Sequence, residues 1–236
     1  MRRRLRLFPL NAVLFPGTAL NLHIFEPRYR QMIEECAQRG EGFGVVLIAD
    51  GAEVGDPNVR PHDVGAIAEI VEVTALPFER YYVSAIGGQR FRIHNIVSRE
   101  PYLIAEVDTI EEVVLQASDE LTVAAFNVRD LFAEYRTLLA EFSGAEIEIE
   151  LPDDAREFSY VVADGLQVAQ AVKQHLLEMD DTIRRLETER SFLERVLPQL
   201  RKLLKRRRKQ LQAHRPQDQA DRGRQEKFFG KFFSAN

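Results

Sequence analysis

The chain has 236 residues, 45% hydrophobic and 29% charged, which is enough apolar material for one or two folded domains and excludes a disordered polymer. Its 32 basic and 37 acidic side chains give a net charge of −5, so the average charge does not point to nucleic acid or an anionic membrane as the main partner. The single cysteine, Cys36, excludes an intramolecular disulfide framework and a thiolate-rich metal site.

The N-terminus superficially resembles an export signal, because three arginines precede an apolar run. Pro9, Asn11 and Pro16 interrupt that run and no small-residue cleavage pattern closes it, so we interpret it as the first strands of a domain. No window reaches the roughly 18 apolar residues that a membrane span needs. We therefore expect a cytoplasmic protein without a membrane span.

A period of two, with β-branched and aromatic residues, dominates the chain up to about residue 110. The strand candidates cover residues 4–8, 12–15, 44–49, 64–75, 80–86, 89–97 and 102–110. Gly87 and Gly88 permit the positive φ of a tight turn, so residues 81–97 are predicted to form a hairpin. A mostly antiparallel sheet of this kind suggests a small barrel.

One helix is predicted inside the β region. Pro27 suits a first helical turn, Tyr29 and Met32 begin an apolar helical stripe, and Gly40 ends the run. Cys36 lies on the apolar side of this helix, which favours a buried, inert thiol.

From residue 118 the period changes to that of a helix, with Ser118 as the candidate N-cap and residues 143–144 as the end. A second helical pattern follows residues 151–154. A third runs from about Glu178, with leucines spaced by threes and fours over nearly five heptads. We expect this last helix to pack in a bundle and then to continue as a coiled-coil arm.

The sequence contains no phosphate-binding Gly-rich loop with its lysine and no Gly-x-Ser-x-Gly elbow. The five histidines lie far apart without a helical His pair, and the acidic pairs are sequence neighbours, which diverge by about 100° on a helix. We therefore expect no catalytic residue, no metal and no cofactor. An enzyme with an undetected site stays open as an alternative.

Seven segments, in order over residues 4–200, resemble the N-terminal substrate-binding domain of the Lon protease family. They are residues 8–17 (FPLNAVLFPG), 22–30 (LHIFEPRYR), 43–48 (FGVVLI), 64–68 (VGAIA), 89–93 (QRFRI), 102–107 (YLIAEV) and 173–179 (KQHLLEM). The resemblance implies an α+β fold, in which a PUA-like, mostly antiparallel β-barrel with one inserted helix precedes an α-helical bundle. It also implies recognition of unfolded or exposed polypeptide segments, without the ATPase and protease modules of full-length Lon.

The resemblance places peptide binding at the turn into the first helix, at Phe25, Glu26, Arg28, Tyr29 and Arg30. For Phe25 and Tyr29 the sequence favours core contacts, and the three charged residues are equally interpreted as groups that fix the turn through hydrogen bonds and ion pairs. Both interpretations stay open from sequence.

Beyond the resemblance, residues 195–236 hold 13 basic and three acidic residues, so their net charge is +10, against −15 for residues 1–194. A basic arm is formed by Lys202, Lys205, Arg206, Arg207, Arg208 and Lys209. Such a segment could bind nucleic-acid phosphates, an anionic membrane surface or the acidic body of this or another subunit, or it could be a solvated helix end. Four phenylalanines near the C-terminus form a hypothetical docking tail for a partner or a neighbouring subunit, namely Phe228, Phe229, Phe232 and Phe233.

The sequence thus predicts four segments. They are a barrel (1–115), a helical bundle (116–194), a basic helical extension (195–213) and a flexible tail (214–236). The favoured function is a non-enzymatic polypeptide-binding module in protein quality control, which recognises clients, a protease or a chaperone and could self-associate through its C-terminal helix. The alternatives are a nucleic-acid-associated PUA-like protein that binds through its basic arm, and a purely structural protein.

Overall fold

The computed structural model describes residues 2–56, 58–111, 118–144 and 151–230, with side chains described up to residue 210. The chain forms two compact units. Unit 1 comprises Met1–Phe126 and Glu150–Glu189, and unit 2 comprises Asn127–Ile149 and Arg190–Asn236. Two helices, α2 (Asp119–Ser143) and α5 (Thr182–Gly230), begin in unit 1 and end in unit 2.

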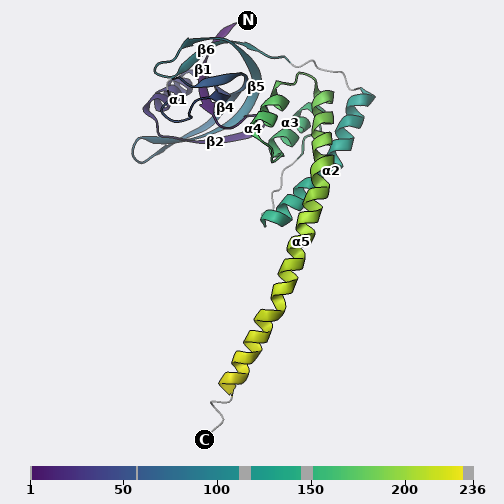
Figure 1. Ribbon diagram of the computed structural model, residues 1–236. Coiled ribbons are helices and arrows are strands. Elements are labelled where there is room, and N and C mark those ends of the chain that lie inside the picture. Colours follow the sequence, from purple (N-terminus) through teal and green to yellow (C-terminus); the bar gives the residue numbers. More distant parts are fainter. Residues whose placement is uncertain (1, 57, 112–117, 145–150, 231–236) are drawn as a thin grey trace. The chain divides into compact units, whose positions relative to one another are not determined.

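Unit 1 is built around a mixed six-stranded sheet (Figure 1). The strands are β1 (Arg3–Leu10), β2 (Ala19–Ile24), β3 (Phe43–Asp50), β4 (Arg60–Leu76), β5 (Arg80–Ser98) and β6 (Leu103–Thr109). Their order is β2-β5-β4-β3-β1-β6, and a further pairing of β5 with β6 closes a near-barrel. β1 and β3 run parallel and the other pairs run antiparallel. With its inserted helix and the helices that follow, this sheet confirms the predicted α+β class.

The long strand β5 corrects the predicted hairpin. Gly87 and Gly88 lie inside one continuous strand and not in a turn, and Gly87 pairs with Ala68 of β4. A Cβ on Gly87 would lie 2.0 Å from the Phe15 carbonyl oxygen, so this glycine allows the backbone of another segment to approach. The backbone N–H of Gly87 donates to the Thr18 carbonyl at 2.8 Å, and its carbonyl accepts from Gly17 at 2.7 Å.

The second predicted strand is also wrong. Residues 12–15 have no strand structure, and Val13, Leu14 and Phe15 are buried in an irregular segment. The strand lies instead at β2, where Leu20, Leu22 and Ile24 alternate with polar residues. This apolar run therefore predicts that its side chains are buried, but it does not predict a strand.

The inserted helix α1 (Pro27–Arg39) forms as predicted. Pro27 occupies the first turn, and Gly40 ends the helix with a φ of 62°, in the left-handed region that favours glycine. Tyr29, Met32 and Cys36 are among its buried residues. Burial raises the pKa of the Cys36 thiol to about 11, which agrees with an inert side chain.

The core of unit 1 consists of two buried clusters that share β1. Leu5 and Leu7 belong to one cluster with Phe91, whereas Phe8 and Leu10 belong to the cluster beneath α1. The period-two alternation of β1 therefore supplies both clusters.

Two short helices, α3 (Ala155–Gly165) and α4 (Gln170–Glu178), complete unit 1 with the first turns of α5. Asp154 caps α3 by accepting from the backbone N–H groups of Arg156 and Glu157. The sequence pattern did not predict α4 as a separate helix. It is fixed to the sheet by Gln174, whose Nε2 donates to the Val64 carbonyl at 3.0 Å.

Unit 2 contains the later turns of α2 and most of α5. Glu134 of α2 pairs with Arg201 of α5, and Glu141 of α2 pairs with Arg208 of α5. The second pair lies seven residues after the first on both helices, so the two helices run parallel there. The helix α5 continues to Gly230, so the end predicted near residue 213 is wrong. Residues 231–236 of the predicted tail lie outside the described residues.

Candidate functional site

The strand β2 forms an open edge of the sheet. Among the described residues it pairs with β5 on one side only. An edge strand presents backbone N–H and C=O groups to any other extended chain, and proteins usually block such edges with charged residues, prolines or bulges. The sequence of β2, ALNLHI, contains no proline and no Lys, Arg, Asp or Glu, and its pairing with β5 has no register shift. The edge of β2 therefore retains the capacity to accept a strand.

A small cavity of about 170 Å³ lies along β2. Residues 21–25 line it together with Phe8, Leu10, Tyr29, Val54, Glu26 and Glu53. Phe25 and Val54 are exposed large hydrophobic residues, at 56% and 58%. We call β2, Phe25, Glu26, Glu53 and Val54 the β2 edge site. It combines an open strand edge, an apolar surface and two carboxylates.

The five residues predicted for peptide binding divide into exposed and supporting positions. Phe25 is exposed at the β2 edge site, whereas Tyr29 is only 4% exposed and its ring stacks on Phe8 at 4.1 Å between centroids. Burial raises the pKa of Tyr29 to about 12. Tyr29 therefore supports the site from within the core.

Glu26 and Arg28 fix the turn that enters α1. The Arg28 guanidinium donates from Nε to the Glu26 carboxylate at 3.0 Å, and its Nη2 lies 2.9 Å from the same oxygen. It also lies 4.5 Å from the centre of the Tyr29 ring. These contacts hold Phe25 at a defined place at the end of β2.

Arg30 connects α1 to the tip of the β4–β5 hairpin. Its Nη1 donates to the Glu79 carbonyl at 2.8 Å and to the Glu79 carboxylate at 2.6 Å. The hydrogen bond from Arg30 lowers the pKa of Glu79 below its ordinary value. Phe78 and Glu79 have φ values of 64° and 52°, a left-handed conformation that is costly for residues other than glycine and here forms the tight hairpin turn.

This turn displays a second aromatic residue, Phe78, which is 88% exposed. The last residue of β2, Ile24, pairs with Tyr81 near the start of β5. Phe25 follows Ile24 and Phe78 precedes Tyr81, so both aromatic residues lie at the same end of the β2–β5 pair. Sequence reasoning missed Phe78. The available signal was a phenylalanine directly after Pro77, in a segment that joins two strand patterns.

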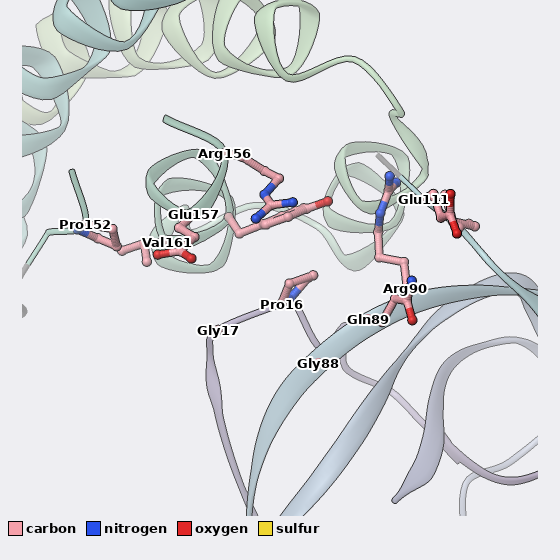
Figure 2. A pocket seen from close by; sticks show the side chains of 12 residues that line it. Pro16, Gly17, Gly88, Gln89, Arg90, Glu111, Pro152, Arg156, Glu157 and Val161 are labelled. Carbon is pink, nitrogen blue, oxygen red and sulfur yellow. The ribbon is translucent and has the colours of Figure 1, made fainter. Parts of the chain in front are cut away.

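A larger pocket of about 610 Å³ lies at the other end of β2, beside Pro16 and Gly17 (Figure 2). Residues of α3 form one side, and residues 88–90 of β5 form another. The described residues that line it include Arg90, Arg156 and Glu157 but no serine, threonine, cysteine or histidine.

A buried polar network lies behind this pocket. Arg90 is 2% exposed and donates to the carbonyls of Leu177 and Met179 at 2.6 and 2.9 Å. On the far side of the network, Arg185 stacks 4.0 Å from the centre of the Tyr160 ring. These contacts connect the β5 strand to α3, α4 and the start of α5.

Within the same network, Arg185 Nε donates to Ser159 Oγ at 2.8 Å, and Ser159 Oγ donates to Glu189 Oε1 at 2.9 Å. Burial raises the pKa of Glu189 well above its ordinary value. Glu189 Oε2 has no hydrogen-bond partner among the described residues.

The predicted basic arm lies on α5 in unit 2. All six residues, Lys202, Lys205, Arg206, Arg207, Arg208 and Lys209, are exposed, and Arg207 and Arg208 also hydrogen-bond to α2. Phe228 and Phe229 fall in the helical range of α5, and their side chains lie outside the described part of the chain. Phe232 and Phe233 lie outside it altogether.

Neither a metal-binding cluster nor a membrane-spanning helix is found in the described residues 2–56, 58–111, 118–144 and 151–230. Across these ranges, no group of three or more His, Cys, Asp or Glu side chains is placed to hold a metal ion. Within the same ranges, every helix is too short or too polar to cross a bilayer.

The sequence matches a family model described as the ATP-dependent protease La (LON) substrate-binding domain, over residues 4–195. Among curated proteins, the Lon protease of Koribacter versatilis is 30% identical over 194 residues, and Lon protease 2 of Myxococcus xanthus is 28% identical over 194 residues. These matches cover 78% and 81% of this chain. The chain spans about a quarter of those relatives, because 23% of each is covered.

Solved structures with the same fold include a Lon N-terminal domain protein from Xanthomonas campestris, which is 28% identical with a TM-score of 0.60. That comparison covers 79% of this chain and 96% of the other. The N-terminal domain of a Mycobacterium avium complex Lon protease has a TM-score of 0.59 at 18% identity, which supports the fold alone.

Proposed function

The chain belongs to the LON substrate-binding domain family, and from this premise we propose that it binds extended polypeptide segments, without cleaving them, at the β2 edge site. The clients are exposed or unfolded segments of other proteins, or a segment of a protease or chaperone with which the chain works in protein quality control.

One observation carries this proposal, which is the open, uncharged edge of β2. A peptide that adds to such an edge gains main-chain hydrogen bonds whatever its sequence, and the neighbouring pockets select its side chains. This mode suits a receptor of many clients, because the backbone is common to all of them.

The side chains around the edge predict which segments bind best. Phe25 and Val54 offer apolar contacts, and the carboxylates of Glu26 and Glu53 line the same cavity. A segment that alternates apolar with basic residues matches this surface, because Glu53 has no ion pair among the described side chains, whereas Glu26 is already paired with Arg28. We expect a short peptide alternating valine with lysine to bind more tightly than its counterpart with glutamate.

The test uses that valine–lysine peptide with N-methyl groups on alternate backbone nitrogens. Each edge of an extended peptide carries the N–H groups of every second residue. We expect one methylation pattern to abolish binding in fluorescence anisotropy and the other pattern to leave it nearly unchanged. Equal affinity for both methylated peptides would show that no strand is added and would overturn the proposed mode.

A further inference from the structure

The helix α5 carries a concentration of positive charge beyond the end of the family match. Residues 196–210 contain seven Lys and Arg residues and no Asp or Glu. The family model ends at residue 195, so this charge belongs to a segment with its own properties.

Some of these cations already have partners within unit 2. Arg201 donates from Nε and Nη2 to the Glu134 carboxylate, both at 2.6 Å, and Arg208 Nε donates to Glu141 at 2.6 Å. Arg207 hydrogen-bonds to the Phe142 carbonyl and lies 5.1 Å from the centre of its ring. These arginines fix α5 against α2, so part of their charge is already compensated by α2 carboxylates.

The remaining cations of the predicted basic arm form one face. Lys202, Lys205, Arg206 and Lys209 are exposed, and within the described side chains none of them has an ion pair or hydrogen bond. Their spacing of three, four and seven residues places them within a face about 100° wide and about 10 Å long. We call these four residues the basic stripe.

The basic stripe points away from the packed side of the helix. Leu204, which is 3% exposed, lies about 150° from the centre of the stripe around the helix axis. Like charges separated by four residues destabilise an isolated helix. Lys202 and Arg206, and Lys205 and Lys209, are two such pairs, and a polyanion on this face would relieve both repulsions.

We propose that the basic stripe binds the phosphate backbone of a nucleic acid. A duplex carries one negative charge about every 1.7 Å along its axis, so a face about 10 Å long meets more phosphates than it has cations. Three of the four residues are lysines, which bind phosphate as point charges, and the fourth, Arg206, can donate to a phosphate through its guanidinium fork. Residues 1–194 carry a net charge of −15, which restricts a polyanion to the arm.

The test compares two full-length quadruple variants with the wild type, using a fluorescein-labelled duplex DNA of arbitrary sequence and a salt series. One variant replaces the stripe (K202Q, K205Q, R206Q, K209Q). The matched control removes four exposed cations from unit 1 (R3Q, R4Q, R39Q, R92Q). Circular dichroism establishes that both variants keep their helix content.

Four phosphate contacts give a slope of about −3.6 in a plot of log affinity against log salt, which is about a 150-fold loss for a fourfold rise in salt. We expect the stripe variant to lose this component of the slope and the control to keep it. Equal affinity of wild type and stripe variant would overturn the proposal, as would an equal loss in the control. If the wild type does not bind DNA and the stripe variant differs from it in oligomeric mass, the stripe contacts a second copy of the chain. This result would also overturn the proposal.

Discussion

Arg30 at the start of α1 holds Glu79 at the tip of the β4–β5 hairpin through two hydrogen bonds, one to the Glu79 carbonyl at 2.8 Å and one to its carboxylate at 2.6 Å. Phe78, the neighbour of Glu79, is the most exposed of the large hydrophobic residues described. The turn into α1 thus determines both where Phe25 emerges and how Phe78 is displayed.

Loss of the Arg30 contact should weaken peptide binding with little effect on stability. In R30Q the hairpin tip loses both hydrogen bonds from Arg30, so Phe78 is held less firmly, although Tyr81 still donates to Glu34 of α1 at 2.7 Å. Exposed ion pairs contribute little to folding. We expect a several-fold higher Kd for the valine–lysine peptide and an almost unchanged thermal midpoint. E79Q keeps the backbone acceptor for Arg30 and should retain most of the affinity. If E79Q loses as much affinity as R30Q, the backbone contact does not position the tip.

The two exposed aromatic residues should contribute directly to peptide affinity. Burying a phenylalanine in a complex is worth about 1.5 to 3 kcal/mol, so we expect F25S and F78S each to weaken peptide binding at least about tenfold. The matched control is F126S, because Phe126 is also exposed, at 65%, but lies on α2. Isothermal titration calorimetry measures the three affinities. A loss in F126S equal to that in F25S would show that general surface hydrophobicity drives binding.

The neighbouring glycines of β5 should differ sharply in their tolerance of a side chain. A Cβ at Gly87 would lie 2.0 Å from the Phe15 carbonyl oxygen, which is rigid backbone, whereas at Gly88 the nearest atoms belong to the flexible side chain of Glu69. We expect G87A to lower the free energy of unfolding by about 1 to 3 kcal/mol and G88A by clearly less. Chemical denaturation measures both. Equal effects would contradict a close approach at Gly87.

The buried Glu189 should make unit 1 less stable at high pH. Burial raises the pKa of Glu189 in the folded chain above its unfolded value, despite the nearby Arg185. The unfolded chain therefore loses this proton at lower pH, and the contribution of Glu189 to stability falls as the pH rises above the ordinary carboxyl pKa toward the folded value.

Glutamine stays neutral at every pH and keeps an oxygen that can accept from Ser159. We therefore expect E189Q to have a higher thermal midpoint than the wild type near about pH 8 and a similar one near about pH 4. E187Q, at the exposed neighbouring position, should follow the wild type at both. A lower midpoint of E189Q at the higher pH would mean that Glu189 is ionised in the fold.

The sequence predicts local structure well where the signal is local. Pro27 and Gly40 mark the ends of α1, and Ser118 accepts a hydrogen bond from the Leu121 N–H at the start of α2. Gly87 shows the opposite case, because its close neighbour is Phe15, 72 positions away in the sequence, and two adjacent glycines look the same in a turn and in a crowded strand.

The candidate site was predicted in part. The turn from Phe25 to Arg30 came from the family resemblance, but the open edge of β2 depends on which strands pair, and no local pattern contains that information. Phe78 lies outside the β2 edge site, and it joins the proposed binding surface because the register of β2 with β5 brings the hairpin tip to the same end as Phe25. The pairing order of the strands therefore identifies the open edge of β2 and the position of Phe78, which residue patterns alone do not predict.

The central claim, that a polypeptide adds to β2, is tested most directly by hydrogen exchange at single-residue resolution. In the free protein, alternate amides of residues 19–24 face the open edge and should exchange rapidly. On saturation with the valine–lysine peptide, we predict that these amides become protected in an alternating pattern. Protection confined to the pocket beside Pro16 and α3, with unchanged exchange along β2, would contradict the account.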